Sequence, residues 1–164
     1  MDERPSIEEL PVKALVALVG GDHVSPGAGS AGAVALALAA ACAGKAVSVS
    51  LKHRPDELHL QDARERFAEM ARRALSGADR DSEAFERFMH EKSAAAAARL
   101  ADSGETLAQM ASILTAAIDD IEPRIQPSMA GDLAAARALA GAAGSIQARN
   151  AAEARDKQRS IEAS

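Results

Sequence analysis

Residues 24–51, which read VSPGAGSAGAVALALAAACAGKAVSVSL, form the stretch of sequence that decides the fold. Pro26 fixes its own φ angle, and Gly27 and Gly29 accept backbone angles that other residues resist. Ser30 is a favoured N-cap residue, because its hydroxyl accepts a hydrogen bond from a free backbone N–H. The pattern therefore predicts a loop up to Ser30 and a long helix behind it.

The helix expected over about 31–51 carries Ala, Gly and Ser on every face, so neighbouring helices can approach it closely. Strand-forming residues are scarce in the chain, which has three Phe and no Trp or Tyr. We predict an all-α fold, an orthogonal or up-down bundle of five to six helices that encloses this central Ala/Gly-rich helix.

The glycine-bearing loop before this helix has two interpretations. A helix N-terminus presents unpaired N–H groups and a partial positive charge, which together can hold an anion. Most Gly-Ser helix starts, however, are plain turns. These residues alone leave both interpretations open.

The composition bounds the kind of protein. The chain has 164 residues, 48% of them hydrophobic and 26% charged, which predicts a single globular domain over 1–164 with a charged C-terminal tail at about 155–164. A net charge of −5 argues against nucleic acid or an anionic membrane as a partner.

Several features predict a cytoplasmic location. The single Cys42 permits no internal disulfide and is interpreted as a buried, inert thiol. The first eleven residues, MDERPSIEELP, are acidic and polar and do not resemble a signal peptide. The apolar stretch from residue 31 is interrupted by Lys45 and consists mostly of Ala and Ser, so a buried helix is expected rather than a membrane span.

Capping and breaking residues place the other helices. Residues 6–9 have the form of a capping box, so the first helix begins at Ser6 or slips towards Leu10. Gly77 predicts a break between helices over about 55–78 and 79–101. Residues 102–105 are expected to end one helix and start the next. The last helix is predicted from about Asp132, fading into the charged tail from residue 153.

One candidate site motif is Asp81-Ser82-Glu83-Ala84-Phe85. One helical turn separates Asp81 from Phe85, so the carboxyl group and the aromatic ring share a helix face. In an apolar pocket the pKa of Asp81 would rise, which suits a proton carrier. Alternatively, Asp81 is a carboxylate that favours the dipole of a helix N-terminus.

A second candidate motif is Gly131-Asp132, with Asn150 eighteen residues further on. The alternative role of Asp132 is that of a plain N-cap. Five helical turns place Asp132 and Asn150 on one side of a helix but far apart. Asn150 would therefore serve a different part of the site, or a site shared with a partner subunit.

Taken in order, the Pro26–Ser30 loop with its Ala-rich helix, the Asp81/Phe85 motif and the Asp132/Asn150 pair resemble the cyclodeaminase/cyclohydrolase family. This family comprises the C-terminal domain of formiminotransferase-cyclodeaminase and the stand-alone methenyltetrahydrofolate cyclohydrolases. The resemblance covers roughly residues 7–154 and implies a homodimer of helical bundles.

The chain departs from the family pattern at several positions. Ala28 replaces the middle glycine of Pro-Gly-Gly-Gly-Ser, Gly131 replaces a serine, and Ala154 replaces an asparagine. Residues 50–56 replace the family's Thr-x-Gly-Lys-x-x-Tyr, which removes its tyrosine and leaves His53 near the position of its lysine. These departures concern the exact activity rather than the fold.

The resemblance implies hydrolysis of 5,10-methenyltetrahydrofolate to 10-formyltetrahydrofolate, or deamination of 5-formiminotetrahydrofolate. The alternative is a diverged relative that binds a small molecule or a partner protein without folate chemistry. No metal and no permanently bound cofactor are predicted, and a tetrahydrofolate derivative is the expected substrate. The predicted catalytic residues are Asp81, Asp132 and His53; the predicted substrate-binding residues are Pro26, Gly27, Gly29, Ser30, Lys52, Phe85 and Asn150.

Overall fold

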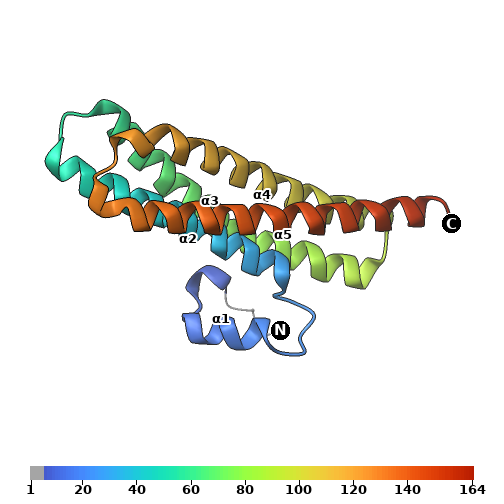
Figure 1. Ribbon diagram of the computed structural model, residues 1–164. Coiled ribbons are helices and arrows are strands. Elements are labelled where there is room, and N and C mark those ends of the chain that lie inside the picture. Colours follow the sequence, from blue (N-terminus) through green and yellow to red (C-terminus); the bar gives the residue numbers. More distant parts are fainter. Residues whose placement is uncertain (1–5) are drawn as a thin grey trace.

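The computed structural model describes residues 6–164, and within them the chain forms helices and no strand (Figure 1). The prediction of an all-α bundle is confirmed. The α-helices are α1 (Val12–Val19), α2 (Ala28–His53), α3 (Leu58–Glu91), α4 (Ala94–Ile121) and α5 (Ala130–Glu162). The 3₁₀ turns are η1 (Ile7–Glu9), η2 (Glu122–Arg124) and η3 (Pro127–Met129). Residues 1–5, with which the acidic N-terminal stretch begins, lie outside the described residues.

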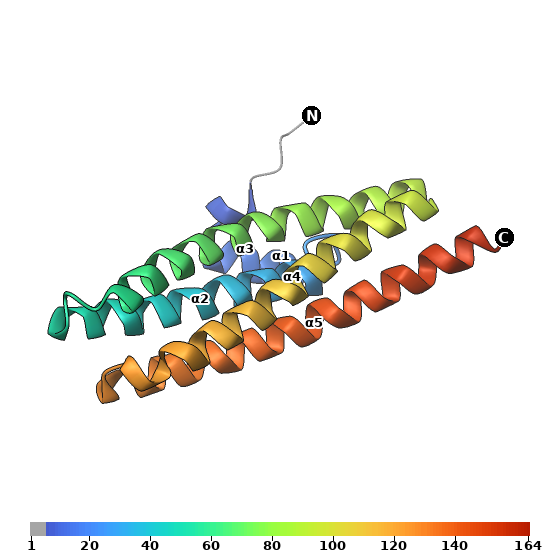
Figure 2. The ribbon, with the colours of Figure 1, turned by 90° about the horizontal axis from the view of Figure 1, so that it is seen from above.

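The four long helices run up and down beside one another, and α1 lies outside them (Figures 1 and 2). Short connections make each long helix antiparallel to the next one in the chain. The central helix α2 packs mainly against α3 and α5, while α4 lies diagonally across the bundle and packs against α3 and α5. The bundle is therefore of the up-down kind.

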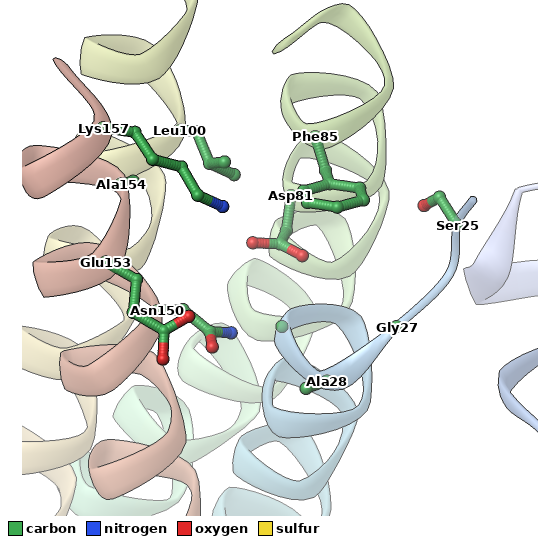
Figure 3. A pocket seen from close by; sticks show the side chains of 11 residues that line it. Ser25, Gly27, Ala28, Asp81, Phe85, Leu100, Asn150, Glu153, Ala154 and Lys157 are labelled. Atoms are coloured by element: carbon green, nitrogen blue, oxygen red, sulfur yellow. The ribbon is translucent and has the colours of Figure 1, made fainter. Parts of the chain in front are cut away.

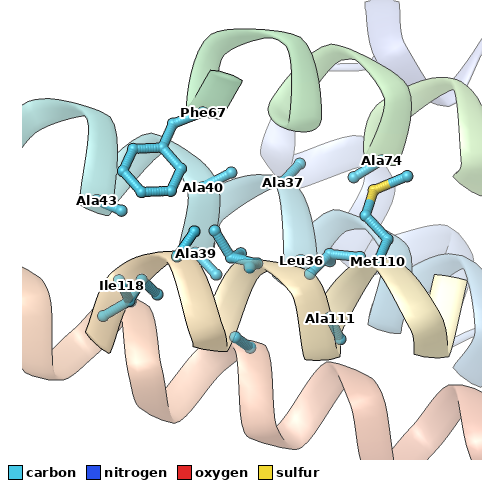
Figure 4. Packing of buried hydrophobic residues seen from close by; sticks show 14 of the residues in the cluster. Leu36, Ala37, Ala39, Ala40, Ala43, Phe67, Ala74, Met110, Ala111 and Ile118 are labelled. Atoms are coloured by element: carbon cyan, nitrogen blue, oxygen red, sulfur yellow. The ribbon is translucent and has the colours of Figure 1, made fainter. Parts of the chain in front are cut away.

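The buried alanines of α2 have small side chains, which allow the neighbouring helices to approach α2 closely (Figure 4). Ala39, Ala40 and Ala43 are buried, and larger side chains of α3 and α4 fill the space in front of them. Phe67, Leu107, Leu114 and Ile118 supply much of that bulk, each almost fully buried. The core thus depends on small residues from α2 and large ones from its neighbours.

Ala40→Leu is expected to destabilise the protein by about 1–3 kcal/mol, because Ala40 is buried and extra methyl groups would overpack the interface. Urea unfolding measures the loss. Ala138→Leu is the matched control, since Ala138 is exposed on α5 and the same substitution has room there. Equal stability of both variants would contradict the central role of α2.

One face of α2 is open, so this helix is not enclosed on all sides as expected. We call this face the open stripe; its residues are half-buried or exposed and comprise Ala31, Val34, Ala35, Leu38, Ala41, Cys42, Lys45 and Val49. Leu38 is 53% exposed. In a four-helix bundle each helix has two adjacent neighbours, which leaves an outward face uncovered. Cys42 lies on this face as a half-buried free thiol, not the fully buried one expected.

By length and composition α2 could also cross a membrane, and it is the one such helix among residues 6–164. Half of its most apolar window is buried inside the bundle. A helix in the core of a bundle can be equally long and apolar without crossing a membrane.

Two predicted helix breaks are wrong, at Gly77 and at residues 102–105, where α3 and α4 run on uninterrupted. The glycines there allow close helix contacts instead: a Cβ added to Gly77 would lie 2.7 Å from Leu107 Cδ2, and one on Gly104 would lie 3.1 Å from Ala151 Cβ. The break that does occur is at Lys92, which has a φ of 48°, and at Ser93, whose Oγ accepts a hydrogen bond from the N–H of Ala96 at 3.1 Å.

Three predicted helix ends also differ from the structure. Ser6 caps only the short η1, and α1 begins after Pro11. Helix α2 begins at Ala28, with Gly27 in the N-cap position, so Ser30 is not its cap. The charged tail is helical, because α5 continues to Glu162. Arg155 holds it to α4 through Glu105 at 2.8 Å and Asp102 at 2.5 Å.

The long helices differ in length, and this difference creates a recess. Helix α2 has 26 residues and is about 39 Å long, whereas α3 and α5 have 34 and 33 residues and are about 50 Å long. Helices α3, α4 and α5 therefore continue beyond the N-terminus of α2, where they pack around a second apolar cluster that contains Phe88, Leu100 and Ala154. The N-terminus of α2 lies in the space between these three helices.

Candidate active site

A cavity of about 190 Å³ lies at this N-terminus of α2 (Figure 3). Four segments meet there: the loop before α2 with the first turn of α2, the second half of α3, the first half of α4 and the second half of α5. Its lining residues are Ser25, Gly27, Ala28, Gly29, Asp81, Phe85, Leu100, Asn150, Glu153, Ala154 and Lys157. Because α2 begins here, its first backbone N–H groups have no partner within the helix and are available to a ligand.

Asp81 is the buried acid of this cavity, with only 6% of its surface exposed. It lies on α3 one turn before Phe85, and among residues 6–164 the one hydrogen bond to its side chain is donated by Ser30 Oγ, 3.4 Å from Asp81 Oδ2. Ser30 Oγ also lies 3.2 Å from the carbonyl oxygen of Ala78, which can accept its proton instead. Burial raises the pKa of Asp81, and the weak Ser30 bond lowers it less than burial raises it.

This raised pKa predicts a pH-dependent cost in stability. A carboxyl group whose folded-state pKa is raised destabilises the folded protein once it ionises, so the cost is absent below the unfolded-state pKa of about 4. It grows as the pH rises from there through the folded-state pKa and is constant above it. Asp81→Asn should therefore gain stability over the wild type with rising pH in urea unfolding. A difference that stays constant from pH 4 to pH 8 would contradict this.

Gly29 lies directly against the Asp81 carboxyl group. A Cβ added to Gly29 would stand 2.6 Å from Asp81 Cγ, which is too close for any side chain. Gly29 is therefore required for close approach between the first turn of α2 and α3. This contact covers one side of the carboxyl group and keeps water away from it.

The other walls combine apolar and polar groups. Phe85, Leu100 and Ala154 supply the apolar surface. Helix α5 supplies Glu153 and Lys157, and in Figure 3 the Lys157 amine points into the cavity towards Asp81. The cavity can thus hold a polar ligand between an amine, a carboxylate and a buried carboxyl group.

The loop before α2 is anchored to α3 beside this acid. The hydroxyls of Ser25 and Ser82 are hydrogen-bonded, and Pro26, which follows Ser25 through a cis peptide bond, is buried. Further back, Ser6 Oγ and the backbone N–H of Ile7 donate to the Asp79 carboxylate at 2.6 and 2.7 Å. The N-terminal segment is therefore attached to α3 on both sides of Asp81.

The structure brings most of the sequence-predicted site residues together. Gly27, Gly29, Asp81, Phe85 and Asn150 line the cavity. Ser30 contacts Asp81 from inside α2 rather than capping it, and Pro26 lies in the anchored loop. Asp81 lies in the second half of α3, far from its N-terminus, so the alternative role as a helix N-terminal carboxylate does not apply.

Three predicted site residues lie elsewhere. Asp132 begins α5, eighteen residues and about 27 Å from Asn150, and it pairs with Lys45 at 2.7 Å. Lys52 and His53 are exposed at the C-terminal end of α2, about 36 Å from its start. These three residues do not reach a ligand in the cavity of the same chain, and their catalytic and binding roles stay predictions.

Sequence reasoning missed Glu153 and Lys157, because residues from 153 onwards read as a charged tail. The signal that would have found them is their spacing, since Asn150, Glu153 and Lys157 follow one another at three and four residues on one face of a helix. Among residues 6–164, no group of three or more His, Cys, Asp or Glu side chains is placed to hold a metal ion.

Comparison with known proteins finds similarity both in sequence and in structure. A sequence profile described as formiminotransferase-cyclodeaminase matches residues 11–151. The crystal structure of formiminotetrahydrofolate cyclodeaminase from Thermotoga maritima matches with a TM-score of 0.82 and 20% identity, over 96% of this chain and 92% of that chain. At this identity the structural likeness shows the fold alone. No curated protein sequence matches the chain significantly.

Proposed function

Because the chain belongs to the formiminotransferase-cyclodeaminase family, we propose that it is a folate one-carbon enzyme whose reaction takes place at Asp81. The substrate is either 5,10-methenyltetrahydrofolate, which is hydrolysed to 10-formyltetrahydrofolate, or 5-formiminotetrahydrofolate, which is deaminated. The observation that carries this proposal is a buried carboxyl group with a raised pKa inside a cavity. Perturbed acids in cavities are typical of catalytic sites.

Both reactions need a proton carrier. In hydrolysis, a base takes a proton from the water that adds to the methenyl carbon, and an acid then protonates the ring nitrogen that leaves. In deamination, the folate's second nitrogen bonds to the formimino carbon and loses its proton, and an acid protonates the formimino nitrogen so that its bond to this carbon breaks and it leaves as ammonia. Asp81 can serve as the acid because its raised pKa keeps a larger fraction protonated near neutral pH.

The neighbouring groups suit the rest of the substrate. Asn150 offers an amide that donates and accepts hydrogen bonds, and Lys157 offers a cation for a carboxylate or for developing negative charge. Phe85 offers one flat apolar face. We assign positioning of the substrate to these three residues and to the N–H groups of Gly27 and Gly29.

The test is incubation of the protein with methenyltetrahydrofolate, following the loss of its near-ultraviolet absorbance against a no-enzyme control. A parallel reaction with formiminotetrahydrofolate is followed by ammonia release. Turnover of either substrate supports the proposal and identifies the reaction. If neither substrate is turned over at saturating concentration, the proposal is refuted.

One observation favours the alternative, a relative that has lost folate chemistry. The cavity of about 190 Å³ is smaller than the roughly 300–1,000 Å³ usual for whole organic ligands, and it contains a single aromatic residue. Binding of tetrahydrofolate without turnover would support this alternative. It would leave a small-molecule or protein partner to be identified.

We also propose that the protein is a homodimer and that the open stripe of α2 contacts the stripe of a second copy. The stripe is apolar and contains no acidic residue in a chain of net charge −5, and its one cation, Lys45, is already paired with Asp132. Two copies therefore meet there without bringing like charges together. A two-fold interface of this kind uses the same surface on both subunits. Residues 1–164 would form one domain in each subunit.

Leu38→Glu is expected to convert the dimer to a monomer, because it places two carboxylates opposite each other in an apolar contact. Sedimentation at micromolar concentration measures the change. Ile113→Glu is the control, since Ile113 is similarly exposed at 48% but lies on α4, away from the stripe. A wild-type protein that sediments as a monomer would overturn the proposed dimer.

A further inference from the structure

Gln147 is a fully buried polar residue on α5, one helical turn before Asn150. Its Nε2 lies 2.6 Å from the carbonyl oxygen of Gly29 and donates a hydrogen bond to it. A carbonyl oxygen only accepts, so the amide nitrogen must face Gly29. Its Oε1 is then left buried without a hydrogen-bond partner among the described residues.

This unpaired oxygen makes the choice of glutamine unusual. A buried acceptor without a partner costs stability, and an apolar side chain of the same shape would avoid that cost. Packing alone therefore does not favour Gln at this position. What Gln147 supplies and Met or Leu cannot is the N–H that holds Gly29.

Gly29 joins Gln147 to the candidate acid. On one side it accepts the hydrogen bond from Gln147, and on the other its Cα lies against the carboxyl group of Asp81. Gly32, one turn later, fits closely around the same side chain, because an added Cβ would lie 2.9 Å from Gln147 Nε2. Helices α5, α2 and α3 thus meet in sequence at Gln147, Gly29 and Asp81.

We propose that Gln147 is a positioning residue, which holds the first turn of α2 against Asp81 and sets the register of Asn150 and Lys157 relative to that acid. Gln147 is absent from the cavity lining and acts through Gly29. Without its hydrogen bond, the first turn of α2 would no longer be tied to α5. Water would then reach the carboxyl group from the side that Gly29 covers.

The pKa of Asp81 is the readout that a purely structural role would not move. The charged side chains that face the cavity are Glu153 and Lys157 of α5; α4 contributes Leu100, and the first turn of α2 contributes no charge. Replacing Gln147 by a neutral residue changes none of these charges. A change in the pKa of Asp81 would therefore report the loss of the Gly29 contact.

The test is Gln147→Met, which keeps the volume and removes the amide. Carbon-13 NMR titration of the Asp81 carboxyl group in the free protein is expected to show its pKa falling towards the usual range. Turnover of the folate substrate is expected to fall about 10- to 100-fold, as for a displaced catalytic group. Leu133→Met is the control, since Leu133 is buried on the same helix 14 residues and about 21 Å away.

The outcomes of this test distinguish the inference from the proposed function. Only the expected fall in turnover rests on the proposed function; the expected change in the pKa of Asp81 does not. An unchanged pKa of Asp81 in Gln147→Met would overturn the inference, whatever the activity. A lowered pKa in a protein whose wild type does not turn over folate would support the inference and refute the function. If Gln147→Met fails to fold, Gly32→Ala gives the same test, because its methyl group displaces the Gln147 amide.

Discussion

Asp81→Asn is expected to lower kcat about 100-fold or more with the folate substrate, while substrate binding changes little. The variant keeps the shape of the side chain but cannot give or take the proton. The size of the effect follows from the usual contribution of a general acid or base. Asp81 is nearly fully buried and contacts Gly29 and Ser30, whereas Glu153, the other acid that lines the cavity, is exposed on α5 and paired with Arg149 at 3.0 Å.

Steady-state kinetics over a range of pH test this prediction, since loss of a proton carrier lowers kcat and kcat/KM together. Asp62→Asn is the control: Asp62 is exposed on the same helix, nineteen residues and about 28 Å before Asp81. Full turnover by Asp81→Asn in a protein whose wild type is active would show that the catalytic assignment is wrong.

Gly29→Ala is expected to be the most damaging single-methyl change at the site. Its Cβ would lie 2.6 Å from Asp81 Cγ, and the carboxyl group is confined by the surrounding helices, so either α2 or α3 must shift. Overpacking of this kind costs about 1–3 kcal/mol of unfolding free energy. A displacement of about 1 Å at the acid is also enough to lower turnover about 100-fold.

Gly141→Ala provides the comparison for Gly29→Ala. Gly141 is exposed on α5, and an added Cβ meets nothing within 4 Å. Alanine there should gain up to about 1 kcal/mol, because it is the better helix former. Urea unfolding and kinetics on both variants measure the contrast. If Gly29→Ala were as stable and as active as the wild type, the tight contact with Asp81 would be disproved.

Local sequence patterns were enough to predict the fold class and the centre of the candidate site. The Ala-rich run after Ser30 is helical in almost any context, since alanine has the highest helix propensity. The four-residue spacing of Asp81 and Phe85 places them on one helix face regardless of what packs there. Gly27 and Gly29 were predicted to adopt backbone angles that other residues resist, but no glycine among residues 6–164 has a positive φ; Gly29 instead lies in the first turn of α2 and allows close approach to Asp81.

Helix boundaries were predicted less well where glycine was read as a break. Gly77 and Gly104 lie inside continuous helices because each allows another helix to approach, and the packing gained there outweighs their low helix propensity. The real break at Lys92 and Ser93 carries no glycine or proline. A left-handed lysine followed by a serine cap is a weak signal in sequence.

The sequence by itself determined that the chain is helical, where its central helix lies, and that Asp81 shares a helix face with Phe85, because these properties depend on neighbours within a few residues. Only the tertiary structure decided which distant residues meet. Helix α2 is about 10 Å shorter than its neighbours, and this difference leaves room for the cavity at its N-terminus. The register of α5 brings Asn150, Glu153 and Lys157 to that cavity. The same register keeps Asp132 more than four helical turns away, because an α-helix is rigid and advances 1.5 Å with every residue.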